Sequence, residues 1–436
     1  MRVRPATTAV TGQHHPAVPT SGAAATSAPA GRWTALTLIA AAQVGVMSTW
    51  FSAAAVGPAL AAAWHLSGPQ LALLTVGVQL GFVAGALTLA VGGIADVFPT
   101  RWVFVAAAVL AAATNASTPV ADADMRIALP LRFALGFVLA GVYPTGMKLM
   151  AGWFREGRGF AIGTLVGALT LGAALPHLFA GVGAATSAPW QGVIAATSVG
   201  ALLSAVVMAA FVRPGPFEAP AARLDLGWAL RALRDPALRL ANFGYYGHMW
   251  ELYAMWTWVP AFLLASLRAS AGAADVAGVG RAASLAAALV IAAGAGGCVA
   301  AGWVADRIGR TYTTAGAMAL SGTCAIVTGL LFGRTPALVV GVAVVWGITV
   351  IADSAQFSAA ISELSEPQRV GSSLALQTSV GFLLTAVSIQ VLPYVERAAG
   401  WPGAFLLLSA GPAAGAVSML RLRARPEAAR LSGGRR

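Results

Sequence analysis

Long apolar runs separated by short polar or Gly/Pro-rich turns divide most of this chain. A helix needs about 20 apolar residues to cross the roughly 30 Å hydrocarbon core of a bilayer. About twelve such runs occur, whereas the ten-residue alternating segments of an outer-membrane barrel are absent. With 58% hydrophobic and 10% charged residues, a water-soluble fold would lack enough polar residues to cover its surface. The sequence therefore predicts an all-α integral membrane protein with twelve transmembrane helices. The predicted spans are 33–56, 71–94, 102–120, 127–149, 160–183, 190–212, 241–266, 282–304, 312–332, 337–361, 371–393 and 402–420.

The net charge of +12 follows the expected topology of these spans. If the first span runs outward from an inside N-terminus, the inner loops collect most arginines, including the six after residue 420. This asymmetry is the positive-inside rule. We therefore expect a multi-pass protein of the bacterial inner (plasma) membrane with both termini cytoplasmic. The basic residues are not gathered on one face, so nucleic acid is not an expected partner.

Composition also predicts the domain boundaries. Residues 1–31 are rich in Ala, Thr, Pro and Ser and are predicted to form a disordered cytoplasmic tail. A stretch with three prolines and several arginines separates the sixth and seventh spans and is predicted to be a cytoplasmic linker. The expected organisation is a tail (1–31), a six-helix bundle (32–213), a linker (214–239), a second six-helix bundle (240–421) and a cytoplasmic C-terminal tail (422–436).

Two short patches recur at nearly one offset. "GGIADVFPTR", residues 92–101, aligns with "GWVADRIGRT", residues 302–311, about 210 positions later. "FREGRG", residues 154–159, aligns with "SEPQRVG", residues 365–371, at nearly the same offset. Such duplication is typical of secondary carriers, in which the substrate site lies near the membrane midplane between two repeats. The repeats predict two pseudo-symmetric bundles.

The second copy of the first patch resembles the loop signature G-x-x-x-D-R-x-G-R of the major facilitator superfamily. The first copy keeps its Gly92 and Asp96, but Val97 and Pro99 replace the usual arginine and glycine. The resemblance extends over nearly the whole chain after residue 31 and implies that family's fold and alternating access. The complete signature comprises Gly302, Asp306, Arg307, Gly309 and Arg310.

On this resemblance, the charged loop residues form a gate. An aspartate at the inner end of one span can lie against the N-terminus of a helix in the opposite bundle, where free N–H groups and the helix dipole favour negative charge. Asp96 would face the start of span eleven, and Asp306 the start of span five. In the alternative, the arginines only follow the positive-inside rule. The gating candidates are Asp96, Arg101, Asp306, Arg307 and Arg310.

An arginine lies early in the fourth span, where a charge is costly and indicates a function. Arg132 begins the pattern R-x-x-x-G-x-x-x-A-G-x-x-P, which resembles the fourth helix of facilitators that carry organic anions. A guanidinium binds carboxylate through two parallel hydrogen bonds. We therefore expect Arg132 to bind the substrate. In the alternative, its side chain snorkels to the outer surface near Arg126.

Three further ionisable residues lie within predicted spans. His248 and Glu251 are three residues apart on one helical face, so their titrations would be coupled if both are buried. Asp353 lies about 15 Å inside the tenth span. These three residues are the proton-coupling candidates, although a structural His–Glu hydrogen bond is an alternative. Gln43 and Gln356 are candidates to orient the substrate.

The sequence contains no phosphate-binding loop and no arrangement of nucleophile and base typical of an enzyme. We expect no cofactor or metal, no enzyme activity, and transport driven by an ion gradient. The predicted function is the movement of a small organic anion, a carboxylate, across the membrane, coupled to protons, by a carrier that works as a monomer in the lipid bilayer. The alternatives are a proton-driven exporter of small amphiphilic compounds and a carrier-like membrane sensor that transports nothing.

Overall fold

The computed structural model describes residues 31–92, 97–154, 158–185, 189–217, 225, 227, 230, 233–271 and 276–436. Every regular element in these residues is helical, and they contain no strand. In this part of the chain, eight helices are long and apolar enough to cross a membrane. The prediction of an all-helical membrane protein is therefore confirmed.

The described helices before residue 212 form the N-terminal group. They are α1 (Arg32–Met47), α2 (Ser52–Ala55), α3 (Gly57–Trp64), α4 (Gly68–Gly92), α6 (Thr100–Ala116), η1 (Thr118–Ala121), α7 (Met125–Leu139), α8 (Tyr143–Trp153), α9 (Arg158–Ala185) and α10 (Gln191–Phe211).

The described helices after residue 235 form the C-terminal group. They are α12 (Pro236–Ala271), α13 (Val276–Ile308), α14 (Arg310–Leu330), α15 (Pro336–Ala352), α16 (Ser354–Leu364), η2 (Pro367–Arg369), α17 (Val370–Arg423) and η3 (Pro426–Gly434).

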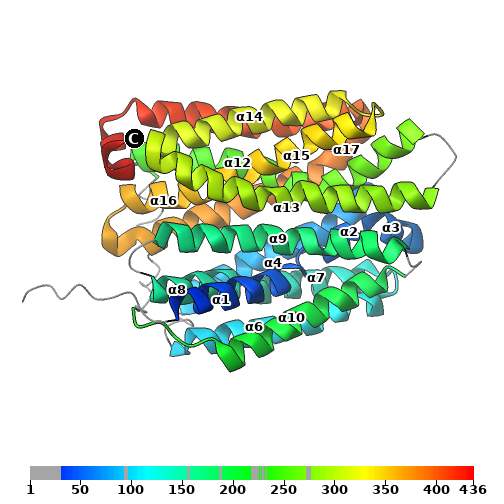
Figure 1. Cartoon of the computed structure of the whole chain (residues 1–436), viewed down its shortest axis with the longest axis horizontal. Helices are drawn as coiled ribbons and strands as arrows, with labels where there is room; N and C mark the ends of the chain where they lie inside the picture. Colours follow the sequence, from blue (N-terminus) through cyan, green and yellow to red (C-terminus); the bar gives the residue numbers. More distant parts are fainter. Residues whose placement is uncertain are drawn as a thin grey trace, which may run out of the picture.

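The two groups lie side by side with their helices running along the length of the molecule (Figure 1). Figure 1 shows the blue to green N-terminal group on one side and the green to red C-terminal group on the other. Helix α9 packs against α13 at the boundary, and α4 packs against α17. A hydrogen bond from Gln390 Nε2 to Pro69 O (3.3 Å) also crosses this boundary. Residues on these four helices therefore control how the groups fit together.

The first predicted span, 33–56, is not one continuous helix. Helix α1 ends at Met47 and α2 begins at Ser52. Between them, Thr49 Oγ1 donates to Val46 O (2.8 Å), and Ser52 Oγ donates to Thr49 O (2.8 Å). Hydroxyl groups that bond to nearby carbonyls compete with the helical hydrogen bonds. The prediction of a regular first span is therefore wrong, and the break leaves backbone carbonyls for other partners.

Two more predicted spans are interrupted. The fourth divides into α7 and α8, and Pro144, which lacks an N–H donor, stands in the first turn of α8. The tenth divides into α15 and α16 at Asp353, which ends one helix and begins the other. Broken helices are tolerated within a membrane where other groups satisfy the backbone. Asp353 is thus placed at a break, where its backbone departs from the regular helix.

The last two predicted spans are joined in α17, which continues for 54 residues. Gly400 interrupts its helical geometry with φ of 66° and ψ of −178°. Glycine adopts positive φ without the steric cost that a Cβ atom would add. The turn predicted between residues 393 and 402 is therefore made at Gly400.

The end of the predicted linker and the C-terminal tail contain helical residues. Helix α12 begins at Pro236, because Asp235 Oδ1 accepts hydrogen bonds from the N–H groups of Ala237 (2.8 Å) and Leu238 (3.0 Å). In the tail, η3 buries Ala428 and Leu431 completely. The tail therefore packs on the C-terminal group.

Candidate functional site

The ionisable residues predicted within spans are all buried. Arg132, His248 and Asp353 are each 1% exposed, and Glu251 is 2% exposed. A charge in the interior of a membrane protein is expensive and normally marks a substrate or ion path. The alternative in which Arg132 snorkels to the outer surface is therefore wrong, because its side chain lies inside the N-terminal group.

Arg132 holds together several segments of that group. Its Nη2 donates to Trp50 O (3.0 Å) in the break between α1 and α2. Its Nε donates to Leu74 O on α4 (3.3 Å). Its Nη1 donates to Ser52 Oγ (3.2 Å) and Asn115 Oδ1 (3.3 Å). All four acceptors are neutral, so in the described residues the guanidinium has no carboxylate partner to balance its charge.

His248 and Asp353 form the central pair of the C-terminal group. The Nδ1 atom of His248, on α12, lies 2.8 Å from Oδ1 of Asp353, at the break between α15 and α16. At this distance the two buried groups form an ion pair when the ring is protonated. His248 Nε2 is buried without a hydrogen-bond partner among the described residues. The pair therefore retains unused capacity to exchange a proton.

Glu251 lies one turn after His248 on α12 but has other partners. Ser321 Oγ donates to its Oε2 (2.7 Å), and Trp346 Nε1 donates to its Oε1 (2.8 Å). These contacts connect α12 with α14 and α15. The sequence places His248 and Glu251 on one helical face, but their side chains have different partners. His248 contacts Asp353, whereas Glu251 accepts hydrogen bonds from two neutral donors.

The two glutamine candidates differ in their environment. Gln356 Oε1 accepts from Arg310 Nη1 (2.7 Å), and the remaining donors of Arg310 bind Glu363 Oε2 (2.8 Å) and Oε1 (2.6 Å). Gln43 Nε2 donates to Leu165 O (3.0 Å), whereas its Oε1 is buried without a donor among the described residues. Gln356 thus belongs to the network that holds the loop of Arg310, and Gln43 keeps a free acceptor.

The other gating candidates lie at the ends of helices. Arg101 Nη1 donates to Val212 O (3.0 Å), which follows α10. Arg307 Nη1 donates to Trp303 O (3.0 Å), and its guanidinium lies 3.3 Å from the centre of the Trp303 ring. Asp306 is exposed, and its backbone oxygen accepts from Arg435 Nη1. Asp96 lies outside the described residues.

A linker residue occupies the start of α17, where Asp96 was expected. The N–H of Asp225 donates to Ser372 Oγ (2.9 Å), and Arg369 Nη1 donates to Asp225 Oδ2. The helix N-terminus favours an acidic group at this position. Asp225 was not predicted from the sequence, because it lies 147 residues before its partner Ser372 and no local pattern connects the two.

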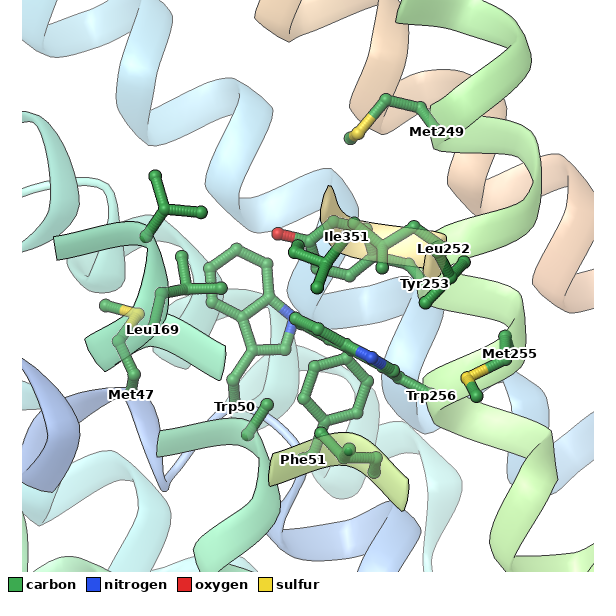
Figure 2. Close-up of a cluster of buried hydrophobic side chains, with 14 of the residues drawn as sticks. Met47, Trp50, Phe51, Leu169, Met249, Leu252, Tyr253, Met255, Trp256 and Ile351 are labelled. Carbon is green, nitrogen blue, oxygen red and sulfur yellow. The ribbon is translucent and has the colours of Figure 1, made fainter. Parts of the chain in front are cut away.

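Aromatic side chains from both groups meet at the boundary (Figure 2). Trp50 lies 4.9 Å from Phe82, 5.9 Å from Tyr253 and 5.6 Å from Phe382, measured between ring centroids. Trp50 and Phe82 belong to the N-terminal group, and Tyr253 and Phe382 to the C-terminal group. A void of about 10 Å³, the size of one water-sized sphere, lies beside Trp50. The boundary is therefore closed in this conformation.

Several buried polar groups were not among the residues predicted from the sequence. Gln79 on α4 and Gln377 on α17 are fully buried, and their amide atoms have no partner among the described residues. Both ring nitrogens of His177 on α9 are in the same condition. More than nine in ten buried polar groups in proteins have a hydrogen-bond partner, so unpaired ones call for an explanation. The only signal in the sequence was a polar residue within an apolar run.

Comparison with known proteins agrees with this architecture. The profile of the Major Facilitator Superfamily matches residues 38–389. No curated protein matches the sequence significantly. A crystal structure of a mutant of the nucleoside transporter NupG superposes with a TM-score of 0.68 and 13% identity, covering 90% of this chain and 99% of that one. At this identity the likeness shows the fold alone, whereas the profile covers most of the chain. The chain therefore belongs to the Major Facilitator Superfamily and has the fold of its membrane transporters.

Proposed function

We propose that this chain is a proton-coupled secondary transporter, which moves a small organic anion, a carboxylate, across the bacterial inner membrane by alternating access. The observation that carries the proposal is the buried pair of His248 and Asp353, whose Nδ1 and Oδ1 atoms lie 2.8 Å apart at a break in the tenth span. Intramembrane histidines and acids of this kind form proton relays in pumps and transporters.

The proposed frame consists of twelve spans in two pseudo-symmetric bundles, 32–213 and 240–421, with both termini cytoplasmic and one chain as the working unit. The breaks in the first, fourth and tenth spans support this frame, because discontinuous helices form the midplane sites of many carriers. Gly400 supplies the turn needed between the last two spans. The segments 1–31, 214–239 and 422–436 are the tails and the linker.

Protons would be carried by the C-terminal group. The unpaired Nε2 of His248 is free to accept a proton when the site opens to one side of the membrane, and Asp353 Oδ1, 2.8 Å from Nδ1, would stabilise the charged ring. Glu251 lies one turn away and can accept a proton on the oxygen that Ser321 or Trp346 releases. The open site would then close only when the pair of His248 and Asp353 carries the proton. This requirement would couple the conformational change to proton movement.

The substrate anion would be attracted by the N-terminal group. Arg132 is a buried cation whose four partners are neutral, and buried charges are normally balanced by an opposite charge. A substrate carboxylate near the break after α1 would supply that charge. Gln43 Oε1 has a free acceptor position that suits a donor group of the substrate, and Gln356 would act through its bond to Arg310.

The gate would be formed by the charged loops of the two repeats. Arg310 holds Glu363 with two hydrogen bonds, which fixes the loop between α13 and α14 to the end of α16. Asp306 and Arg307 stand on the exposed side of this loop, and Arg101 connects the ends of α6 and α10. Asp96 is proposed for the equivalent position in the first repeat.

Purified protein in liposomes tests this function. A proton gradient directed into the liposomes should drive accumulation of at least one labelled carboxylate from a panel. The panel should also include nucleosides, because the chain has the fold of the nucleoside transporter NupG. Loss of a preloaded amphiphile would instead indicate an exporter, and no flux with either gradient would indicate a sensor. Proton-driven accumulation that persists in both Asp353→Asn and His248→Gln would contradict the proposed proton site.

A further inference from the structure

Two tryptophans at the boundary lack the hydrogen bond that buried tryptophans normally make. Trp50 is 3% exposed and Trp256 is fully buried, yet neither Nε1 has an acceptor among the described residues. Other tryptophans of the C-terminal group are paired: Trp250 donates to Leu407 O (3.1 Å), and Trp346 donates to Glu251. Because buried indole N–H groups usually find a partner, the two free donors require a physical reason.

The two tryptophans line one void, and each comes from a different group. Trp50 follows α1 in the N-terminal group, whereas Trp256 belongs to α12 in the C-terminal group. Both line the void of about 10 Å³ described above. Figure 2 shows the indole nitrogen of Trp50 on the side of its ring that faces Trp256. The void is therefore a meeting point of the two groups.

Packing against other rings holds both indoles in place. The Trp50 ring lies against Phe82 of its own group, with a centroid distance of 4.9 Å. The Trp256 ring lies against Tyr253 of its own group at 5.5 Å. Aromatic side chains held in this way lose little entropy when a ligand binds, so their donors are arranged in advance.

The chemistry of these donors indicates what they bind. An indole N–H can only donate, so its partner must be a hydrogen-bond acceptor. A donor residue on each side of one void suits a group with two oxygen atoms, and hydrogen bonds to a charged acceptor are stronger than those to a neutral one. Arg132 adds a buried positive charge through its bond to Trp50 O (3.0 Å). The local field therefore favours an anion.

We propose that the carboxylate of the substrate binds between Trp50 and Trp256 and accepts one hydrogen bond from each indole. This inference rests on the proposed function and specifies the site of its anionic group. The void is too small for a carboxylate in the closed conformation, so the anion enters when the two groups are apart. Binding then adds one donor from each group, which favours the approach of the two halves around the substrate.

Phenylalanine substitutions test the two donors, because they remove the N–H and keep an aromatic ring. The probes are acetate, benzoate and succinate, each compared with its neutral amide, and binding to the purified full chain is measured by thermal shift and calorimetry. We expect the Kd of the tightest acid to rise about 10- to 100-fold in Trp50→Phe and in Trp256→Phe, the loss expected for one hydrogen bond to a charged group. Any fall in the melting temperature should be smaller than for a tryptophan whose N–H is hydrogen-bonded, since a cavity is left but no hydrogen bond is lost.

Trp250→Phe is the matched control on the same helix. It removes a paired donor, so it should lower the melting temperature and leave the Kd within twofold. Unchanged acid affinity in both boundary variants would overturn the inference while the proposed function stands. Equal binding of acid and amide by the unaltered protein would overturn the assignment of an anionic group. If the unaltered protein neither binds nor transports any acid, the proposed function fails as well.

Discussion

Replacement of Arg132 by methionine is predicted to destabilise the protein, because the guanidinium holds the break in the first span. Methionine has a similar length and no charge, so the change removes the hydrogen bonds with little loss of volume. Trp50 O has no helical partner in this break and loses its donor. The four acceptors are Trp50 O, Ser52 Oγ, Leu74 O and Asn115 Oδ1.

The magnitude follows from two opposing contributions. Each hydrogen bond from a charged donor contributes about 1.5–3 kcal/mol, whereas keeping the guanidinium away from water costs several kcal/mol. We therefore expect Arg132→Met to lower the free energy of unfolding by about 2–4 kcal/mol. Ser52→Ala removes only one of the four acceptors and should cost about 1 kcal/mol.

Unfolding in mixed micelles, titrated with a denaturing detergent and followed by circular dichroism, measures both variants. The smaller loss in Ser52→Ala controls for general damage at the break. If Arg132→Met is as stable as the unaltered protein, or more stable, the guanidinium does not hold the first span. The burial of the Arg132 guanidinium would then lower the stability of the protein, and only a bound anion would offset that loss.

Three other stability predictions follow from the packing and the tail. Gly297→Ala should lower the free energy of unfolding by about 1–3 kcal/mol, because a Cβ atom there would lie 2.0 Å from Ile348 O. The control Gly296→Ala should be neutral or slightly stabilising, because its Cβ atom would meet no atom within 4 Å. Detergent unfolding of both variants measures the difference, and equal stabilities would contradict the prediction. Glu251→Leu should lower the free energy of unfolding by about 2–4 kcal/mol, because leucine leaves two buried donors unpaired, and Glu251→Gln should lower it less. Equal unfolding of the two variants in the same titration would refute this prediction. Leu431→Asp should release η3 and make it susceptible to carboxypeptidase, because a charge would replace a fully buried apolar side chain. Ala429→Asp changes an exposed residue and should leave η3 protected. Unchanged protection in Leu431→Asp would show that this side chain does not hold the tail.

Apolar runs predicted the helices well, because hydrophobic length is a local property of the sequence. The breaks were harder to predict. The hydroxyl-rich residues 48–52 carried a signal for the first break, since Ser and Thr compete with helical hydrogen bonds, but the apolar residues around them concealed it. The break at Asp353 had no comparable local signal.

The buried ionisable residues were also recognisable as candidates in the sequence, because a charge within an apolar run is expensive wherever it occurs. Their partners were not predictable. His248 contacts Asp353, more than 100 residues away, and only the packing of α12 against the break in the tenth span brings the two together. The free donors of Trp50 and Trp256 could not be foreseen either, because a missing partner is visible only once every neighbour is placed.

The proposed function requires solute and proton to move together through the buried pair of His248 and Asp353. The most direct measurement uses liposomes that enclose a pH-sensitive dye and start without a pH gradient, to which the transported carboxylate is added. We expect the lumen to acidify as the solute enters through the unaltered protein. Asp353→Asn should exchange labelled for unlabelled solute without any acidification. Solute entry through the unaltered protein with no change in lumenal pH, or undiminished acidification in Asp353→Asn, would contradict it.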